Sequence, residues 1–193
     1  MGSSPTLGTM FIHAHGVVTT EVTTMRYKAV LVFLLMLMPI FVLGATRLLV
    51  VHPLGWQGSE KVHPQIDNML GDFDTVTWIK SSPDEGPWPF SRQPDDVVIA
   101  PTGMIAEDTY FSEDLYVVGG YYKACFQNVV WSLQQHDEQT SVSIVLEGVY
   151  YGSNRTLVEQ GETQELSDEE LLELLDKVDR DRARIVRRKY LPR

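Results

Sequence analysis

The sequence predicts an α/β fold, a three-layer sandwich whose mostly parallel sheet has five strands. Two observations predict it: short aliphatic or β-branched runs alternate with segments of helical spacing, and residues such as Gly, Pro and Ser separate them. Strands that alternate with helices pair in parallel, so this order favours a parallel sheet with helices on both faces. The 193 residues match the usual length of one domain.

Five short runs are the expected strands. The first reads LLVVH and stops where Pro53 and Gly55 interrupt it, and the second alternates as DTVTWIK. The remaining runs are apolar, which is typical of strands buried on both faces. In chain order the strands are expected at residues 48–52, 74–80, 96–100, 115–118 and 141–146. With a strand order of 3-2-1-4-5, the first and fourth strands are neighbours.

Three segments have the spacing of helices. The first spans residues 61–73, and the second, residues 121–135, follows the fourth strand. The third begins at Ser167, which with Glu170 has the pattern of a capping box. Its apolar residues recur at helical spacing, which predicts a final amphipathic helix followed by a basic tail: Leu171, Leu174, Leu175 and Val178.

The N-terminal region is typical of a targeting segment. Residues 29–43 are an uncharged apolar run, preceded by Arg26 and Lys28 and followed by Gly44 and Ala45. A positive start, a short apolar stretch and small residues are the layout of a secretory signal peptide. An uncleaved membrane anchor is the alternative, and both place the body outside the cytoplasm, in the periplasm or the extracellular space.

These features divide the chain into three parts. Residues 1–24 are expected to be disordered or an upstream extension, with Met25 as a second candidate for the true start. Residues 25–45 are the signal peptide or anchor. Residues 46–193 are the single α/β domain, ending in the amphipathic helix with its basic tail.

Charge and composition limit the partners. The net charge of −10 does not favour nucleic acid, which needs a basic face. Residues 179–193 hold seven Lys or Arg against two Asp, so this tail either contacts an anionic membrane or acidic partner, or is a solvated helix end. One cysteine, scattered histidines and the lack of a glycine-rich phosphate loop predict no metal and no cofactor. A small-molecule ligand is the expected partner, and the oligomeric state stays open.

The segment around the single cysteine is the candidate site. Gly119 and Gly120 follow the fourth strand, and Cys125 lies in or near the first turn of the next helix. In an α/β sheet functional groups gather at the carboxyl ends of strands, and helix N-terminal N–H groups favour a thiolate. We therefore expect a lowered pKa for the Cys125 thiol. The alternative is a small buried hydrophobic residue.

This segment resembles part of a known family. Gly119 followed by Cys125 six residues later resembles the G-x5-C segment of the isochorismatase-like cysteine hydrolases. Residues 47–52 resemble the opening strand of that family, residues 95–101 the strand before the cysteine strand, and residues 143–148 the strand after it. The resemblance implies a Rossmann-like α/β sandwich and a cysteine-dependent hydrolysis of a small amide, imine or ester.

The sequence departs from the family at two positions. In the family an Asp ends the first strand and a Lys ends the strand before the cysteine segment, whereas this chain has His52 and Ala100 or Pro101 there. Either His52 replaces the Asp as the base for Cys125, or the chain is a non-catalytic relative that binds a ligand or partner at the cell envelope. A structural envelope protein that uses the basic C-terminal segment is a third hypothesis.

Other residues complete the expected site. Gly119, Gly120 and Tyr121 are expected to contact the substrate, and Trp88 is expected to form an aromatic wall over it. Asp84 and Glu85 lie in a Ser-, Pro- and Gly-rich loop, residues 81–94, where we expect both carboxylates to be solvated.

Overall fold

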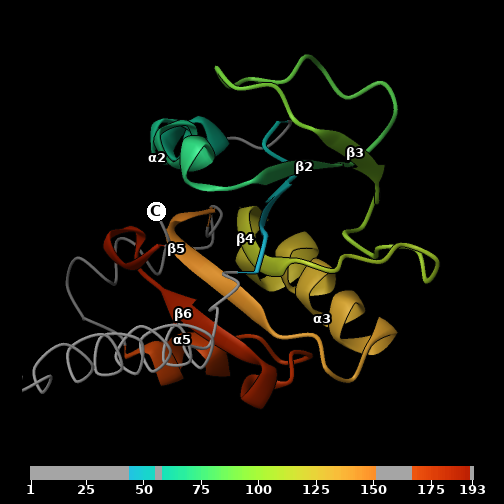
Figure 1. Cartoon of the computed structure of the whole chain (residues 1–193), viewed down its shortest axis with the longest axis vertical. Coiled ribbons are helices and arrows are strands. Elements are labelled where there is room, and N and C mark those ends of the chain that lie inside the picture. The colour runs from blue at the N-terminus through green and yellow to red at the C-terminus, as the bar shows by residue number, and fades with distance from the viewer. Residues whose placement is uncertain (1–43, 55–57, 151–166, 192–193) are drawn as a thin grey trace, which may run out of the picture. The chain divides into compact units, whose positions relative to one another are not determined.

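A six-stranded sheet, parallel throughout, forms the centre of the part of the chain that the structure describes (Figure 1). The computed structural model describes residues 44–54, 58–150 and 167–191. The strands cross the sheet in the order β3-β2-β1-β4-β5-β6. They are β1 Thr46–Val51, β2 Thr75–Lys80, β3 Asp96–Ile99, β4 Asp114–Tyr121, β5 Val142–Tyr150 and β6 Ala183–Val186.

The predicted α/β fold and its parallel sheet are confirmed, with one correction to the strand count. All five expected strands are present, and β1 and β4 are neighbours as the 3-2-1-4-5 order requires. The sheet has six strands rather than five, because the basic tail contributes β6. The strand β4 also continues through both glycines to Tyr121 instead of ending at Val118.

The C-terminal helix is shorter than predicted. α5 covers Asp168–Glu173, and its capping box forms as expected: Ser167 Oγ accepts from the Glu170 N–H, and the Glu170 carboxylate accepts from the Ser167 N–H. After Glu173 the backbone forms successive three-residue turns. Such turns keep residues three apart on one side, so Leu175 and Val178 are buried without a continuous helix.

β6 occupies the place where a basic helical tail was predicted. Ala183 and Ile185 pair with Val142 and Ile144 of β5 and point their side chains into the core, while Arg184 between them is exposed. This period of two is the pattern of an edge strand with one buried face. Four arginines near it form ion pairs, three with acidic residues of the body and that of Arg182 with Asp179 of the tail: Arg180, Arg182, Arg187 and Arg188.

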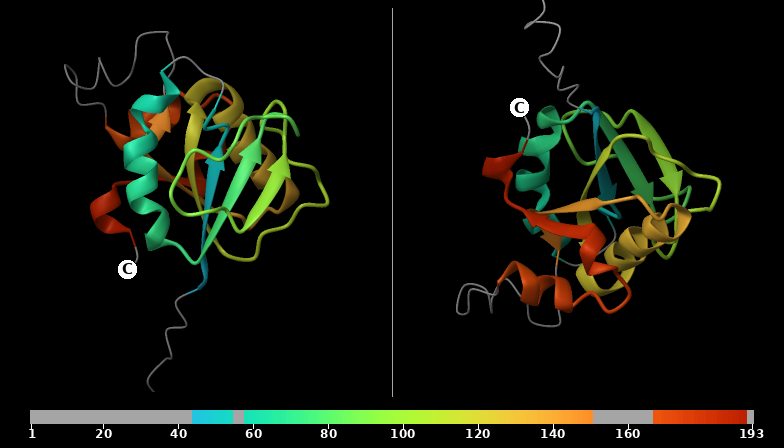
Figure 2. Two further views of the ribbon diagram at one scale, coloured as in Figure 1. Left: turned by 90° about the horizontal axis from the view of Figure 1, so that it is seen from above. Right: turned by 60° about the horizontal axis from the view of Figure 1, so that its bottom comes forward.

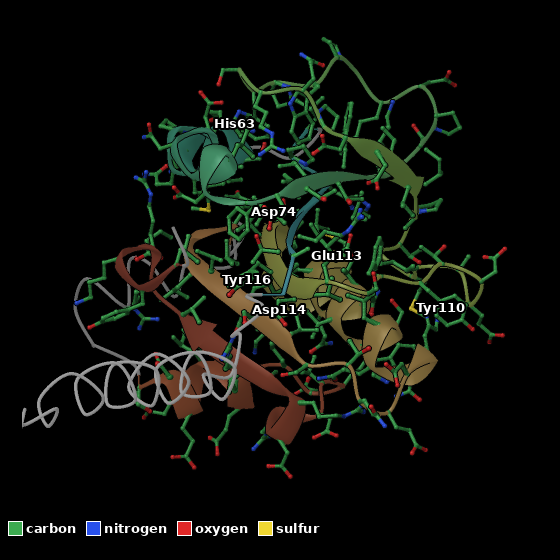
Figure 3. The ribbon with its side chains drawn as sticks, in the orientation of Figure 1. His63, Asp74, Tyr110, Glu113, Asp114 and Tyr116 are labelled. Carbon is green, nitrogen blue, oxygen red and sulfur yellow. The ribbon has the colours of Figure 1, made fainter. Side chains whose placement is uncertain are left out.

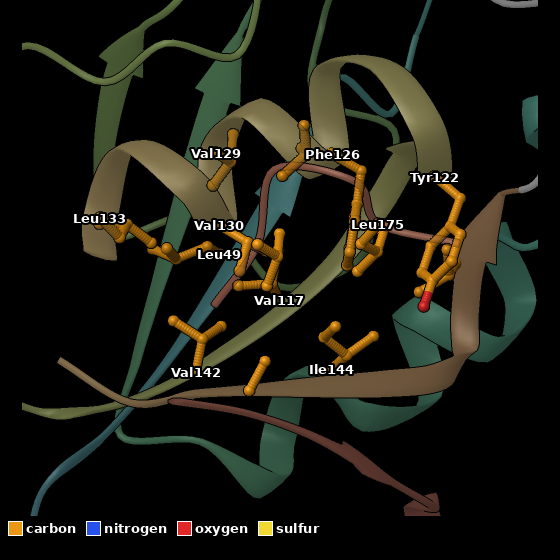
Figure 4. Close-up of a cluster of buried hydrophobic side chains, with 14 of the residues drawn as sticks. Leu49, Val117, Tyr122, Phe126, Val129, Val130, Leu133, Val142, Ile144 and Leu175 are labelled. Carbon is orange, nitrogen blue, oxygen red and sulfur yellow. The ribbon is translucent and has the colours of Figure 1, made fainter. Parts of the chain in front are cut away.

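Helices cover both faces of the sheet (Figure 2). α2, His63–Met69, lies on one face between two short 3₁₀ turns, and its residues pack with Leu48 and Val50 of β1. α3, Gln127–His136, and α5 pack on the other face. Figure 4 shows part of this second group of side chains, here called the α3-side cluster. The cluster includes Leu49, Val51, Val117, Tyr122, Cys125, Phe126, Val129, Val130, Leu133, Ile144 and Leu175.

The amino edge of the sheet is tied together by paired charges. Arg47 at the start of β1 donates to the carboxylates of Asp96 (2.5 Å) and Glu113 (2.6 Å), and Asp74 accepts from the N–H and hydroxyl of Thr46. Figure 3 labels Asp74 and Glu113 beside the start of β1. These hydrogen bonds hold the pKa of both carboxyls below the usual range. These charged groups are already paired with each other and connect neighbouring strands. The candidate site is therefore sought at the opposite, carboxyl edge of the sheet.

The predicted targeting segment lies outside the described residues. This applies to residues 1–24 and to the apolar run at 29–43. None of the helices within the described ranges has the length and apolar character needed to span a bilayer.

Replacement of Gly119 by Ala should destabilise the fold by at least about 2 kcal/mol, because a left-handed conformation strains any other residue. Gly119 has φ +92°, and an added Cβ would lie 2.3 Å from the carbonyl oxygen of Val51. Gly71→Ala is the matched control, since a Cβ there meets nothing within 4 Å. Urea unfolding of both variants measures the difference, and equal stabilities would contradict the role of Gly119.

Candidate functional site

The carboxyl ends of four strands converge on one edge of the sheet. His52 follows β1, and its N–H donates to the carbonyl of Ile79 in β2 (2.9 Å). The N–H of Ala100, just after β3, donates to the carbonyl of Lys80 (2.8 Å). The end of β4 pairs with β1 through Gly119 and Val51. Polar groups that follow these strands are therefore brought to a common place, as expected for a parallel sheet.

His52 has an uncommon backbone and a fixed ring. Its φ of +42° makes it the one described non-glycine residue in the left-handed region, a conformation in which histidine is enriched among non-glycine residues. The side chain is fully buried, and Nε2 lies 2.8 Å from the carbonyl oxygen of Ala100. A carbonyl only accepts, so Nε2 carries the proton and Nδ1 has a free lone pair.

The free lone pair on Nδ1 of His52 is unusual, because no N–H or O–H group of the described residues donates a hydrogen bond to it. Nδ1 is buried and lacks a hydrogen-bond partner among the described residues. Burial lowers the pKa of His52, although the Ala100 carbonyl and the charge of Glu85 oppose this shift. At neutral pH the ring is therefore a neutral base held in one tautomer.

Cys125 lies in a π-helical turn, Tyr122–Phe126, that joins β4 to α3. Ala124 within this turn has non-helical dihedral angles (φ −129°, ψ −108°), so the turn is kinked next to the cysteine. Tyr122 and Phe126 anchor the turn in the α3-side cluster, as Figure 4 shows, and the Tyr122 hydroxyl donates to the carbonyl of Leu171. π-helical turns are frequently found at functional sites.

The glycine pair lets the thiol approach the end of β1. A Cβ on Gly120 would lie 2.8 Å from Cys125 Sγ and 3.0 Å from Cγ1 of Val51. The sulfur therefore packs against the backbone of β4 beside the last residue of β1, directly before His52. The loop after β3 also touches this turn, since a Cβ on Gly103 would lie 2.1 Å from the carbonyl oxygen of Cys125.

The expected lowering of the Cys125 pKa is wrong. The side chain is only 6 % exposed, and burial raises the pKa of its thiol. Backbone groups of Tyr121, Phe126 and Cys125 lower it, as a helix start should, but burial outweighs them. The charge of Glu85 raises it further. The resting form is therefore a neutral thiol, which needs a base to become a nucleophile.

Glu85 belongs to this site, although the sequence analysis placed it in solvent. Its Oε2 accepts from the N–H (2.5 Å) and the hydroxyl (3.0 Å) of Ser81, which follows β2. Its Oε1 is buried without a partner in the described part of the chain. The one available signal was its position five residues after the carboxyl end of β2, a strand that neighbours β1.

The other expected site residues divide into two groups. Gly119, Gly120 and Tyr121 lie beside Cys125, and the Tyr121 ring packs against that of Tyr150 (5.2 Å between centroids). Trp88 is not brought to the cysteine. It packs on Trp78 with the core group of the α2 face, and its indole N–H donates to the carbonyl of Arg92.

The described residues contain no group of three or more His, Cys, Asp or Glu side chains arranged to hold a metal ion. Comparison of the chain with family models, with curated proteins and with solved structures gave no match. What the site can do chemically is therefore argued from its buried base, its neutral thiol and the nearby carboxylate.

Alkylation of Cys125 by iodoacetamide should be slow at neutral pH, and its rate should rise with a midpoint above the ordinary cysteine value of about 8.5. The physical reason is burial of the thiol. Glu85→Gln should lower this midpoint, because it removes a charge that opposes the thiolate, while Asp84→Asn, an exposed neighbour, should not. If Cys125 in the folded protein shows an alkylation midpoint at or below the ordinary cysteine value, the raised thiol pKa is wrong.

His52 should make stability depend on pH. Its pKa in the folded state is lowered, so the unfolded state binds more protons just below the ordinary value of about 6.5. Its contribution is present above that value and is lost as the pH falls. His52→Asn, which tolerates a left-handed backbone, should flatten the urea-unfolding free energy between about pH 5 and pH 7.5 relative to the native chain. His63→Gln should retain the slope, and equal slopes for all three proteins would refute the prediction.

Proposed function

We propose that this chain is an exported, isochorismatase-like cysteine hydrolase of a small amide, imine or ester. Cys125 is the nucleophile and His52 is its general base. The observation that carries the proposal is the buried Nδ1 of His52, which has no hydrogen-bond partner among the described residues, at the strand edge where the Cys125 thiol packs. Buried polar groups are nearly always hydrogen-bonded, so an orphaned one calls for a ligand or a proton transfer.

One hydrogen bond supports a working site rather than a decayed one. In the resemblance His52 stands at the Asp position and the Lys position falls at Ala100 or Pro101. Nε2 of His52 donates to the carbonyl of Ala100. This contact fixes the tautomer that leaves Nδ1 free to accept a proton. A chain that had merely lost its catalytic groups would have no reason to hold a strained, buried histidine there.

The chemistry follows from these protonation states. Nδ1 of His52 takes the proton of the Cys125 thiol as the sulfur attacks the substrate carbon. The carbon–sulfur bond forms, and the leaving nitrogen or oxygen departs with the proton from the imidazolium. Water then attacks the acyl carbon, His52 removes its proton, and the thiol is regenerated with release of the acid.

One observation favours a second candidate, a non-catalytic ligand-binding domain. The thiol is buried and its pKa is raised, as for a structural cysteine. In this alternative His52 and Glu85 hold a ligand and no covalent bond forms. The two candidates differ in whether a covalent Cys125 adduct appears during turnover.

Incubation of the full-length protein with p-nitrophenyl acetate and with a panel of small amides should trap an acyl group on Cys125 by mass spectrometry. Cys125→Ala should abolish turnover, and His52→Asn should lower kcat/KM by about 10²–10⁴-fold, the usual contribution of a general base. His63→Gln is the matched control, because His63 Nε2 also lies close to a backbone carbonyl, that of Pro53 (2.7 Å). Circular dichroism confirms that each variant folds. Unchanged turnover in Cys125→Ala would refute the cysteine hydrolase, and binding without turnover or adduct in the native chain would leave the ligand-binding alternative.

A further inference from the structure

Two buried acceptors in the segments that follow β1 and β2 lack a donor among the described residues. They are Nδ1 of His52 and Oε1 of Glu85. Since Nε2 of His52 already donates to Ala100, Nδ1 offers only a lone pair, and a carboxylate oxygen also only accepts. A buried group left unsatisfied costs about 1–3 kcal/mol, so both atoms favour a partner that brings N–H or O–H groups. The complementary ligand is rich in donors.

The free oxygen of Glu85 is held in place. Ser81 fixes Oε2 with its N–H and its hydroxyl, so the carboxylate has little freedom to turn Oε1 toward another donor. The next residue, Gly86, packs near the side chain of Leu54, two residues beyond His52. The turn that carries Glu85 therefore packs against Leu54, in the segment that follows β1. A preorganised acceptor of this kind binds a ligand without first reordering the loop.

The charge at the site is negative. Glu85 is the one charged side chain whose field shifts the pKa of His52 and of Cys125, and it raises both. The nearest cation on β2 is engaged elsewhere: Lys80 Nζ donates to the carbonyl of Pro83 (2.9 Å) and lies over the Trp78 ring. An anionic substrate would therefore be repelled, and a cationic group would be attracted in a poorly solvated place.

We propose that the substrate of this site is a planar nitrogen cation, an amidinium or guanidinium group, whose N–H groups donate to Glu85. The proposal rests on the proposed function and selects the imine-type member of its substrate classes. An amidinium or guanidinium donates a charge-assisted hydrogen bond to the free oxygen of Glu85 and leaves Nδ1 of His52 available for the thiol proton. Its central carbon is also the electrophile that a thiol attacks, whereas an alkylammonium offers no such carbon.

The reaction balances without a further reagent. The Cys125 sulfur adds to the amidinium carbon while its proton moves to His52. Ammonia departs with that proton as the carbon–nitrogen bond breaks. Water then replaces the sulfur, so the amidinium and one water give an amide and an ammonium ion. Glu85 is a binding residue in this scheme, because it holds the cation and exchanges no proton.

Three probes of one shape test the charge preference. Benzamidine is a cation, benzamide is neutral and benzoate is an anion, and isothermal titration of the full-length protein measures their affinities independently of turnover. Benzamidine should bind at least about tenfold more tightly than benzamide, the size expected of a charged hydrogen bond, and benzoate should bind most weakly.

Glu85→Gln should remove the preference. Its amide oxygen can keep the Ser81 contact while a donor replaces the free acceptor. Asp84→Asn, the exposed neighbour, should retain the preference.

The outcomes separate this inference from the proposed function. Equal affinities for benzamidine and benzamide, tighter binding of benzoate, no binding of any probe, or a preference that survives in Glu85→Gln would each overturn the cationic substrate. None of these results bears on the acyl adduct of Cys125. Conversely, a Glu85-dependent preference for benzamidine without any Cys125 adduct would keep the cation site and refute the hydrolase.

Discussion

β4 approaches β1 closely at Gly119 and Val51, and the arrangement of residues at the carboxyl edge of the sheet depends on this contact. A side chain at Gly119 would collide with the Val51 backbone, so a residue other than glycine would force the central strands apart. The register between β4 and β5 also shifts at Gly119, which shows that β4 bends there. Because of this bend, Gly120 faces the Cys125 sulfur and the π-helical turn folds back onto the sheet. The same contact therefore closes the sheet and positions the thiol.

The polar groups at the two edges of the sheet differ in how they are paired. At the amino edge two terminal nitrogens of the Arg47 guanidinium are paired with two carboxylates, and such pairing compensates opposite charges. At the carboxyl edge His52 and Glu85 each keep one buried acceptor without a donor among the described residues, which lowers stability. An acceptor left without a donor beside a candidate nucleophile fits a site whose missing partner is a ligand. The buried thiol fits the same interpretation, because desolvation keeps it neutral until a base acts on it.

The sequence was sufficient to predict the strands and helix starts that are encoded by a local run of apolar residues or by a capping motif. Runs such as residues 48–52 and 141–146 predicted β1 and β5, and the Ser167 capping box predicted the start of α5. β6 was missed because it is four residues long and lies among arginines, so its alternation of Ala183 and Ile185 is a weak signal beside the charge. The length of α5 was overestimated, since three-residue turns preserve nearly the same apolar face as a helix.

The candidate site was predicted only where topology decides it. Strand order brings the end of β1 to the turn after β4, so Cys125 and His52 were placed on one edge from the sequence. Glu85 and Trp88 lie in the same loop, and no sequence pattern shows which of the two turns inward. The Cys125 pKa was misjudged for a similar reason. The helix start is visible in the sequence, whereas the burial that outweighs it depends on packing from several elements.

The hydrogen bond between His52 and the carbonyl of Ala100 explains why an imidazole suits position 52. An aspartate at position 52 would place a carboxylate against the Ala100 carbonyl and near the charge of Glu85, so acceptors and negative charges would meet without a donor. Here the imidazole N–H supplies that donor. The chain therefore holds a neutral imidazole, rather than a carboxylate, at the carboxyl edge of the sheet.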